Sequence, residues 1–359
     1  MALSACYIRG YLQVENLDLP GVINAQAAPY GMDPTGATDA GPAIQSAATA
    51  AGGANGGIVF LGRGTPLIST SVDIPSGVEI VGAGYKATTI TNGCAGDLFT
   101  MNDVDRCGIR MLTIDAASVR SAGYAVRITG GTTGIGSLVR AEHSIDVDMN
   151  NQYDGVLIED NASDEGPWNS CVGDPGRMAI WKNFAVNRFP YTLNAPHGAG
   201  HFVKNLWIFG NETPANGSYA LRLQGFGDVT IEGISTWGTI HGLLVDPVGI
   251  VQPSVGLITC SDSIFDFAEN ECFRFNPSDP VTGVIVGNFN NCWFATSRTK
   301  SNVRGSNGAT HQINFNACTF LNAAAYGLRG DTGCDANTFK VNNGNFSPIA
   351  NVSGTTSYV

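Results

Sequence analysis

The sequence predicts an all-β protein: a single right-handed parallel β-helix, a solenoid of about ten coils, closed at its N-terminal end by a short α-helix. Three observations lead to this prediction. Glycine is abundant, at 46 of 359 residues, whereas charged residues make up only 14% and runs of Leu, Glu and Lys are few. Short apolar segments recur every 26 to 29 residues, and one amphipathic helical segment precedes them. These features favour short strands and tight turns over packed helices.

Residues 1–28 come before the first repeat and are interpreted as an extension that attaches the protein to a larger particle. The beginning of this extension does not resemble a signal peptide, because Arg9, Glu15 and Asp18 interrupt the apolar run that such a peptide requires. No stretch of the chain approaches the roughly 20 apolar residues that cross a bilayer. Export by a cleaved leader and insertion into a membrane are therefore not predicted.

Residues 39–51 predict a short amphipathic helix. Asp39 is placed to accept hydrogen bonds from the free N–H groups of the first turn, and Pro42 suits that turn. The apolar face comprises Ala43, Ile44, Ala47, Ala48 and Ala51. Gly52 and Gly53 end the helix. Such a helix would cover the strand edges of the first coil, which otherwise invite aggregation.

Four segments in the second half superpose on one another, each with alternating apolar residues and one marker aromatic. The markers are Phe265, Phe294, Phe320 and Phe346, with spacings of 29, 26 and 26 residues. The ladder continues toward the N-terminus at intervals of 28 residues, with Trp237 and Phe209. A period of this size, without a helical stripe, predicts one solenoid coil per repeat, with alternate side chains pointing into a shared core.

Two further regularities are in phase with these markers. The residue two positions before each marker is small, which predicts an internal column of Ser235, Ser263, Cys292, Cys318 and Gly344. A second ladder of short strands, each closed by a polar turn, covers residues 124–130, 153–160, 219–225, 241–247, 272–277 and 326–331. β-Sandwiches and propellers need hairpin turns at shorter regular spacing, and those turns are missing from the sequence.

The start of the predicted solenoid carries a distinctive set of residues. They are Tyr30-Gly31, Asp33, Thr35-Gly36, Thr38-Asp39, Ala43-Ile44-Gln45, Gly56-Gly57-Ile58-Val59-Phe60, Gly64-Thr65 and the segment SGVEIVGAGYKATTI at 76–90. This stretch resembles the N-terminal signature of the pectate-lyase-like β-helix superfamily, found in phage tailspikes and many polysaccharide-degrading enzymes. The resemblance implies a capped β-helix, commonly a trimer in such spikes, and a structural role for the signature residues. Because the fold hosts enzymes and binding proteins alike, function has to be inferred from the site.

The strand SIDVDMN holds the candidate catalytic pair, Asp146 and Asp148. Their i, i+2 spacing predicts that both point outward, with the intervening apolar residues toward the core. Glu159 follows a short distance later as a third candidate. Glycan hydrolysis requires two carboxyl groups that face one groove, and ordinary solvated surface is the alternative interpretation. A second acidic cluster, ranked lower because its segment keeps the repeat length, comprises Asp262, Asp266, Glu269 and Glu271.

Residues 161–178 form the longest interruption of the repeat, and long insertions on a solenoid commonly form its binding face. The candidate substrate-binding residues of this loop are Asp164, Glu165, Trp168, Asp174 and Arg177. An exposed Trp beside carboxylates suits a sugar ring, through apolar stacking and hydrogen bonds. Burial of Trp168 beneath its own loop is the alternative interpretation.

Charge and cysteine usage narrow the range of functions. A net charge of −11 and a pI near 4.8 argue against binding to nucleic acid or an anionic membrane, since both require clustered Lys and Arg. The nine cysteines include no CxxC pair and no zinc spacing, so they are predicted to be reduced and buried, and no metal or cofactor site is expected. The catalytic motifs of polygalacturonases and pectate lyases and the GxSxG elbow are also missing.

Together, these observations predict a phage tailspike-like virion protein that binds a bacterial surface polysaccharide, with cleavage of that polysaccharide left open. The expected partners are the polysaccharide, other virion proteins bound through the N-terminal segment, and further copies of the chain in a homotrimer. Two other interpretations stay open. One is a non-catalytic structural or decoration protein of a virion, and the other is a free polysaccharide lyase or glycoside hydrolase.

Overall fold

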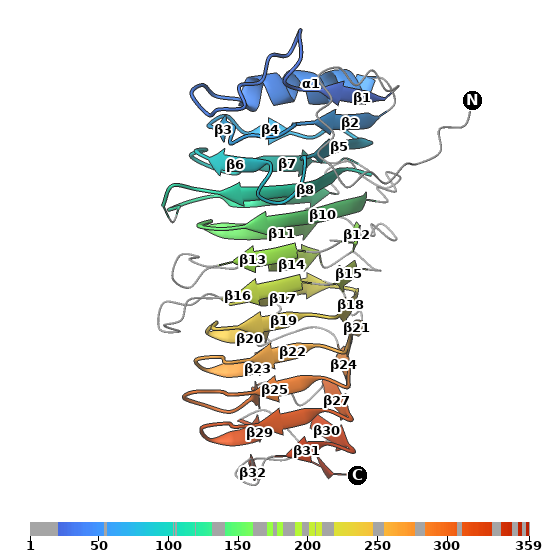
Figure 1. Ribbon diagram of the computed structural model, residues 1–359. Coiled ribbons are helices and arrows are strands. Elements are labelled where there is room, and N and C mark those ends of the chain that lie inside the picture. The colour runs from blue at the N-terminus through green and yellow to red at the C-terminus, as the bar shows by residue number, and fades with distance from the viewer. Residues whose placement is uncertain are drawn as a thin grey trace, which may run out of the picture.

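The computed structural model shows a right-handed parallel β-helix with one helix across its N-terminal end, as predicted (Figure 1). It describes residues 21–53, 56–102, 104, 106–118, 120–130, 141–160, 171–174, 178–181, 191–195, 201–204, 206–209, 219–246, 255–276, 284–306, 311–331, 339–346, 351–353 and 357–358. Every strand pairing within these residues is parallel, and each coil adds a strand to the neighbouring coil. The strands form three sheets that run along the solenoid.

The largest sheet has 15 strands. They are β1 (Val22–Asn24), β2 (Gly57–Phe60), β3 (Leu67–Ile68), β5 (Val78–Val81), β6 (Thr89–Asn92), β8 (Gly108–Asp115), β10 (Ala141–Met149), β12 (Cys171–Asp174), β13 (Met178–Trp181), β16 (Leu206–Phe209), β19 (Ser235–Trp237), β22 (Ile264–Asp266), β25 (Trp293–Ala295), β28 (Thr319–Leu321) and β31 (Asn345–Phe346). Because β1 pairs with β2, the sheet starts before residue 29, inside the segment that was interpreted as an extension.

The second sheet has 11 strands and the third has seven. The 11-stranded sheet comprises β4 (Val72–Asp73), β7 (Phe99–Asn102), β9 (Tyr124–Gly130), β11 (Asp154–Asp160), β14 (Tyr191–Ala195), β17 (Leu221–Phe226), β20 (His241–Val245), β23 (Glu271–Phe275), β26 (Val303–Gly305), β29 (Tyr326–Gly330) and β32 (Asn351–Ser353). It contains the second predicted ladder. The seven-stranded sheet comprises β15 (His201–Lys204), β18 (Asp228–Glu232), β21 (Val255–Ser261), β24 (Val284–Asn290), β27 (Gln312–Asn316), β30 (Phe339–Asn342) and β33 (Ser357–Tyr358).

Helix α1 (Gly41–Gly53) lies over the first coil and buries one face against it (Figure 1). The buried residues are Gly41, Ile44, Ala47, Ala48 and Ala51. Asp39 joins the helix to the coil, because its Oδ1 accepts from the N–H groups of Gly41 and Ser69, both at 2.9 Å, and Thr70 Oγ1 donates to its Oδ2 at 2.6 Å. Burial would raise the pKa of Asp39, but these hydrogen bonds hold it below its usual value.

Stacked phenylalanines fill the C-terminal half of the core. Phe265 pairs in register with Phe294, and Phe294 with Phe320, with ring centroids 5.4 and 5.5 Å apart. Phe320 pairs with Phe346, so this part of the marker ladder is confirmed. The small-residue column is also found, since Ser263, Cys292 and Cys318 are almost fully buried at successive coils.

The N-terminal continuation of the marker ladder is wrong by one residue. Phe265 pairs with Thr236 rather than Trp237, and Thr236 pairs with Ile208 rather than Phe209. One residue reverses the face of a strand on which a side chain lies, so Trp237 occupies the row next to the internal one, and the backbone of Phe209 pairs with that of Trp237. Ser235 accordingly pairs with Ile264, which is exposed, and does not belong to the internal column.

Candidate functional site

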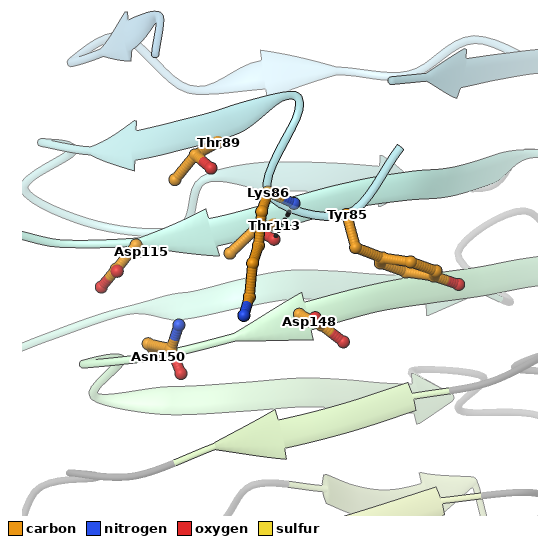
Figure 2. Close-up of a pocket in the computed structure, with 7 residues that line it drawn as sticks. All are labelled: Tyr85, Lys86, Thr89, Thr113, Asp115, Asp148 and Asn150. Carbon is orange, nitrogen blue, oxygen red and sulfur yellow. Dashed lines mark hydrogen bonds between the residues drawn. The ribbon is translucent and has the colours of Figure 1, made fainter. Parts of the chain in front are cut away.

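A pocket of about 560 Å³ opens on the outer face of the 15-stranded sheet, near its N-terminal end. Its lining residues are Tyr85, Lys86, Thr89, Thr113, Asp115, Asp148 and Asn150 (Figure 2). Three successive strands, β6, β8 and β10, supply the floor, and the loop of residues 82–88 supplies one wall. The lining therefore combines two carboxylates, one ammonium group, an amide and several hydroxyl groups.

Strand alternation places the two carboxylates on the outer face. Leu112, Ile114, Val147 and Met149 are fully buried, so the residues between and beside them face away from the core. Asp148 of β10 pairs with Thr113 of β8, and Asp115 lies two residues after Thr113 on β8. Because coils are about 4.8 Å apart and two strand residues span about 6.6 Å, the Cα atoms of the two aspartates are about 8 Å apart.

Local hydrogen bonds hold Asp115 in position. Its Oδ1 accepts from the N–H of Ala116 at 2.7 Å and from Nδ2 of Asn151 at 2.9 Å. Asp148 is largely shielded from solvent, with 7% of its surface exposed. Figure 2 shows the two carboxylates on adjacent strands of the same face.

The loop of residues 82–88 is fixed to the strand beneath it. The N–H of Gly84 donates to the carbonyl of Met111 at 2.9 Å, and the N–H of Lys86 donates to Thr113 Oγ1 at 3.0 Å. Met111 is the extra residue of a β-bulge in β8, with a φ of 56°. The side chain of Lys86 extends from this loop toward the space between Asn150 and Asp148 (Figure 2).

The model of the rhamnogalacturonase A/epimerase, pectate lyase-like family matches residues 23–243, which is more than half of the chain. The chain belongs to this family. The match covers every residue of the pocket, whereas the C-terminal coils lie beyond it. No curated protein matches the chain significantly.

Solved structures share the fold of this family member at low sequence identity. The A-module of mannuronan C-5 epimerase AlgE6 from Azotobacter vinelandii is 13% identical, with a TM-score of 0.60, over 94% of this chain and 99% of that one. The tailspike protein of Acinetobacter phage vB_ApiP_P1 is 11% identical, with a TM-score of 0.61, over 94% and 59%. A mutant tailspike protein of E. coli bacteriophage HK620, in complex with a pentasaccharide, is 11% identical, with a TM-score of 0.55, over 95% and 65%.

The structure places the predicted site residues in different surroundings. Asp148 lies in the pocket, and the backbone of Asp146 lies in the same strand, opposite Arg110. Asp174 ends β12, where its backbone pairs with Ser144. The side chains of Asp146 and Asp174 lie outside the described part of the chain. The predicted residues wholly outside it are Asp164, Glu165, Trp168 and Arg177.

Glu159 is not brought together with Asp148. It lies on β11 of the 11-stranded sheet, whereas Asp148 lies on β10 of the 15-stranded sheet. Its carboxylate accepts from Nη2 of Arg127 at 3.0 Å, and this hydrogen bond raises the pKa of Arg127 above its usual value. The structure thus pairs Glu159 with an arginine on a neighbouring coil.

Asp115, Lys86 and Tyr85 are pocket residues that sequence reasoning missed. Asp115 is the last residue of β8, which ends in the alternating segment MLTID, and Asp148 is the last residue but one of β10, which alternates in the same way. That likeness is the signal that could have identified it. The two aspartates are 33 positions apart, which exceeds the repeat of 26 to 29 residues, so the repeat length concealed their proximity.

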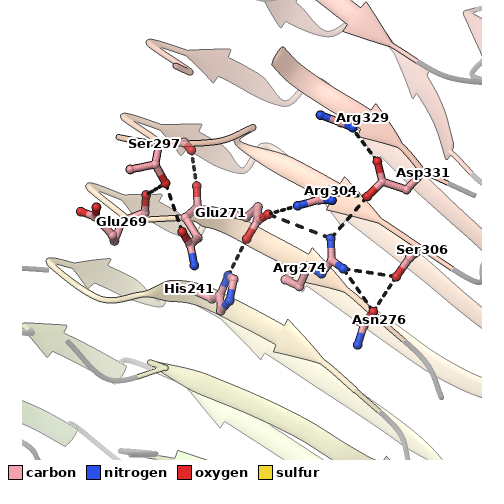
Figure 3. A network of polar contacts seen from close by, with 12 residues as sticks. His241, Glu269, Glu271, Arg274, Asn276, Ser297, Arg304, Ser306, Arg329 and Asp331 are labelled. Carbon is pink, nitrogen blue, oxygen red and sulfur yellow. Dashed lines mark hydrogen bonds and ion pairs between the residues drawn. The ribbon is translucent and has the colours of Figure 1, made fainter. Parts of the chain in front are cut away.

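Of the second acidic cluster, Glu271 belongs to a network of ion pairs on the 11-stranded sheet (Figure 3). Glu271 is 1% exposed; its Oε2 lies 2.9 Å from Nδ1 of His241, and its Oε1 lies 3.3 Å from Nη1 of Arg304. Asp331 contacts Nε of Arg304 at 2.5 Å and Nε of Arg329 at 2.7 Å. These contacts connect successive coils, because β20, β23, β26 and β29 are neighbours in the sheet.

Basic side chains surround each acid of this network. Burial would raise the pKa of Glu271, but His241 and Arg274 hold it below its usual value. Burial likewise opposes the ionisation of Asp331, and hydrogen bonds from Arg304 and Arg329 lower its pKa. Outside the network, Glu269 pairs with Arg298, and Asp262 accepts from an asparagine on the next coil. We infer that these contacts stabilise the stacking of successive coils.

Acidification is expected to destabilise the protein through this network. The folded-state pKa values of Glu271 and Asp331 lie below their ordinary values of 4.5 and 3.8. The stability they contribute is therefore complete above about pH 5 and is lost as the pH falls below 4.5. Thermal unfolding followed by circular dichroism at pH 7, 5, 4 and 3 would measure this loss. Glu271→Gln should flatten the dependence and Glu269→Gln should keep it; identical profiles for both variants would contradict the assignment.

Among the described residues, no three or more His, Cys, Asp and Glu side chains are arranged to hold a metal ion. The described helix is too short to cross a membrane. Six described cysteines are unbridged and buried. Burial raises the pKa of Cys94 to about 11, so its thiol stays protonated at neutral pH.

Proposed function

We propose that this chain binds a bacterial surface polysaccharide in the Asp115–Asp148 pocket and serves as a phage tailspike-like protein of a virion. The pocket carries the proposal, because its carboxylates, amide and hydroxyl groups match the hydrogen-bonding pattern of sugar hydroxyls. Tailspike proteins among the structural neighbours support it, and one of them is in complex with a pentasaccharide. The sheet beneath the pocket is a rigid support, which favours a fixed binding geometry.

Cleavage of the polysaccharide is a second candidate function, favoured by the diagonal arrangement of the two aspartates. Inverting glycosidases place their two carboxyl groups about 6.5–9.5 Å apart, which leaves room for the attacking water. The Cα atoms of Asp115 and Asp148 are about 8 Å apart, a spacing from which rotation of the side chains can bring the two carboxyl groups into that range. In this proposal one carboxyl group activates water and the other protonates the leaving oxygen.

The decisive experiment measures binding and product together. Purified protein is titrated with capsular polysaccharide and lipopolysaccharide from candidate hosts, and new reducing ends are assayed in parallel. Asp115→Asn and Asp148→Asn should each weaken binding by roughly 10- to 100-fold, since each removes charge-assisted hydrogen bonds. Asp262→Asn is the matched control, because this exposed aspartate lies at a corner of the solenoid outside the pocket.

The outcomes separate the candidate functions. New reducing ends with the wild type, lost in both pocket variants, would support cleavage; binding without product would support a spike that only adheres. Unchanged binding in both pocket variants would contradict the proposed site. Failure of the folded wild type to bind any host glycan would favour a structural or decoration protein.

The virion role includes two further proposals, a homotrimer and attachment through residues preceding β1. Sedimentation equilibrium of the full chain should give three times the mass of 37.5 kDa. A chain lacking residues 1–20 should keep its glycan affinity and lose its association with phage particles. A monomeric mass, or unchanged association after truncation, would contradict the corresponding proposal.

A further inference from the structure

The outer face of the 15-stranded sheet extends from the pocket toward the C-terminal coils in a continuous row of paired residues. Asp148 pairs with Ala179, and Ala179 with Trp207. The following pairings, each one coil further on, lead through Ser235 and Ile264 to Trp293. The row thus joins a pocket carboxylate to two tryptophans on one face of the solenoid.

The apolar members of this row are unusually exposed. Trp207 and Ile264 are 46% exposed and Trp293 is 41% exposed, whereas Phe265 and Phe294 in the adjacent internal column are fully buried. A large apolar side chain half in water forgoes much of the stabilisation that burial provides. Solvent-facing positions of a sheet accept polar residues readily, and Ser235 occupies one in this same row. Three such side chains in one solvent-facing row, rather than apolar residues scattered singly, point to a binding surface.

A second row on the same sheet is aromatic as well. The pairings of β13 with β16 and of β16 with β19 align Trp181 with Phe209 and Phe209 with Trp237. Four of the five tryptophans of the chain therefore lie on strands of this one sheet, and none lies on a described strand of the other two. Trp168, the fifth, lies outside the described residues.

We propose that the row from Asp148 to Trp293 is a platform for an extended glycan chain, which runs along the solenoid axis from the Asp115–Asp148 pocket and stacks sugar rings on Trp207 and Trp293. The inference rests on the proposed function and extends its site. With coils about 4.8 Å apart, Trp207 lies about 10 Å from Asp148, and Trp293 lies about 24 Å from it. The platform therefore recognises a chain of several sugars rather than a single unit.

The pattern of side chains favours a glycan over a protein partner. The core of a protein interface is a contiguous apolar patch, whereas Ser235 separates Trp207 from Ile264 in this row, and Thr319 follows Trp293. An indole offers an apolar face to the C–H side of a sugar ring and an N–H to its hydroxyl groups. Continuity with a polar pocket also suits a ligand that is polar along its whole length.

The test compares long and short fragments of one ligand. Host lipopolysaccharide O-chain is partly hydrolysed and separated into single repeating units and long oligomers, and both are titrated calorimetrically. Trp207→Ala and Trp293→Ala should each weaken binding of the long fragments about tenfold and leave the short fragments unaffected. Asp148→Asn should weaken both. Leu257→Ala, at a 37% exposed apolar residue on the seven-stranded sheet, is the control and should change neither.

Each result decides between the proposals. Tryptophan fluorescence that changes with the long fragments and not with the short ones would support the platform. Wild-type binding of long fragments by both tryptophan variants would overturn the platform alone, with the pocket retained. A lower oligomeric mass of these variants with unchanged affinity would mark the face as an interface between copies and would overturn it too. No binding by the folded wild type would overturn both proposals.

Discussion

Replacement of Phe294 by alanine is expected to lower the free energy of unfolding by about 3–5 kcal/mol. The Phe294 ring is fully buried and lies between Phe265 and Phe320 of the adjacent coils. It also meets the edges of Phe289 and Phe315, with centroids 5.9 and 5.6 Å away. Strand register fixes all these neighbours, so they cannot collapse into the space that alanine would leave. Equilibrium denaturation with guanidinium chloride would measure the loss.

The adjacent residue is a matched control for this prediction. Trp293 is also a large aromatic on the same strand, but it points outward and is 41% exposed. Trp293→Ala should therefore cost less than about 1 kcal/mol. Because each coil of a solenoid contacts only its neighbours, Phe294→Ala should also raise hydrogen exchange most strongly in the coils on either side. Equal denaturation midpoints for the two variants would refute the inward stacking of Phe294.

Replacement of Glu271 by alanine is expected to cost about 3 kcal/mol. The carboxylate is 1% exposed and lies among His241, Arg274 and Arg304, which lose their common anion in the variant. These three side chains are themselves only 10–25% exposed, so water compensates for the lost contacts incompletely. Denaturation midpoints at pH 7 would measure the effect.

Two comparisons isolate the effect of the buried charge. Glu271→Gln keeps the shape and one acceptor oxygen, so it should cost less than Glu271→Ala. Glu269→Ala removes a carboxylate paired with Arg298, whose side chain is 45% exposed, and should cost less than about 1 kcal/mol. A Glu271→Ala variant no less stable than Glu269→Ala would show that the network contributes little to stability.

The fold was predictable from the chain because its signals are local. Alternation of apolar residues specifies a strand, and a repeat of 26 to 29 residues specifies a coil that stacks on its neighbours. The capping helix was equally visible, although it spans Gly41–Gly53 rather than residues 39–51. Asp39 proved to hold the first coil as well as the helix, through Ser69 and Thr70.

Whether an individual aromatic side chain points into or out of the solenoid was harder to predict. Trp237 and Phe294 both recur at the expected spacing, yet Phe294 is inside and Trp237 lies one residue away from the internal register. Coil length varies, and a change of one residue at a corner reverses the face on which a side chain lies. Sequence spacing alone cannot detect that change, whereas strand pairing determines it directly.

The candidate site, too, was only partly predictable from the sequence. The alternation of apolar residues in one strand was enough to predict that Asp148 points away from the core, and the structure places it in the pocket. Its neighbours Asp115 and Lys86 come from an earlier coil and an earlier loop, and their positions depend on a bulge at Met111. Glu159 follows Asp148 closely in sequence, but the turn between β10 and β11 carries it onto another sheet.

The sequence by itself determined that this protein is a capped solenoid, because period, alternation and capping are properties of neighbouring residues. Tertiary structure alone decided which residues share a surface. Only stacking of the coils sets Asp115 diagonally beside Asp148 and aligns both with Trp207 and Trp293. Residues that pair across adjacent coils are 17 to 36 positions apart in the sequence, and their register depends on the exact length of every turn between them.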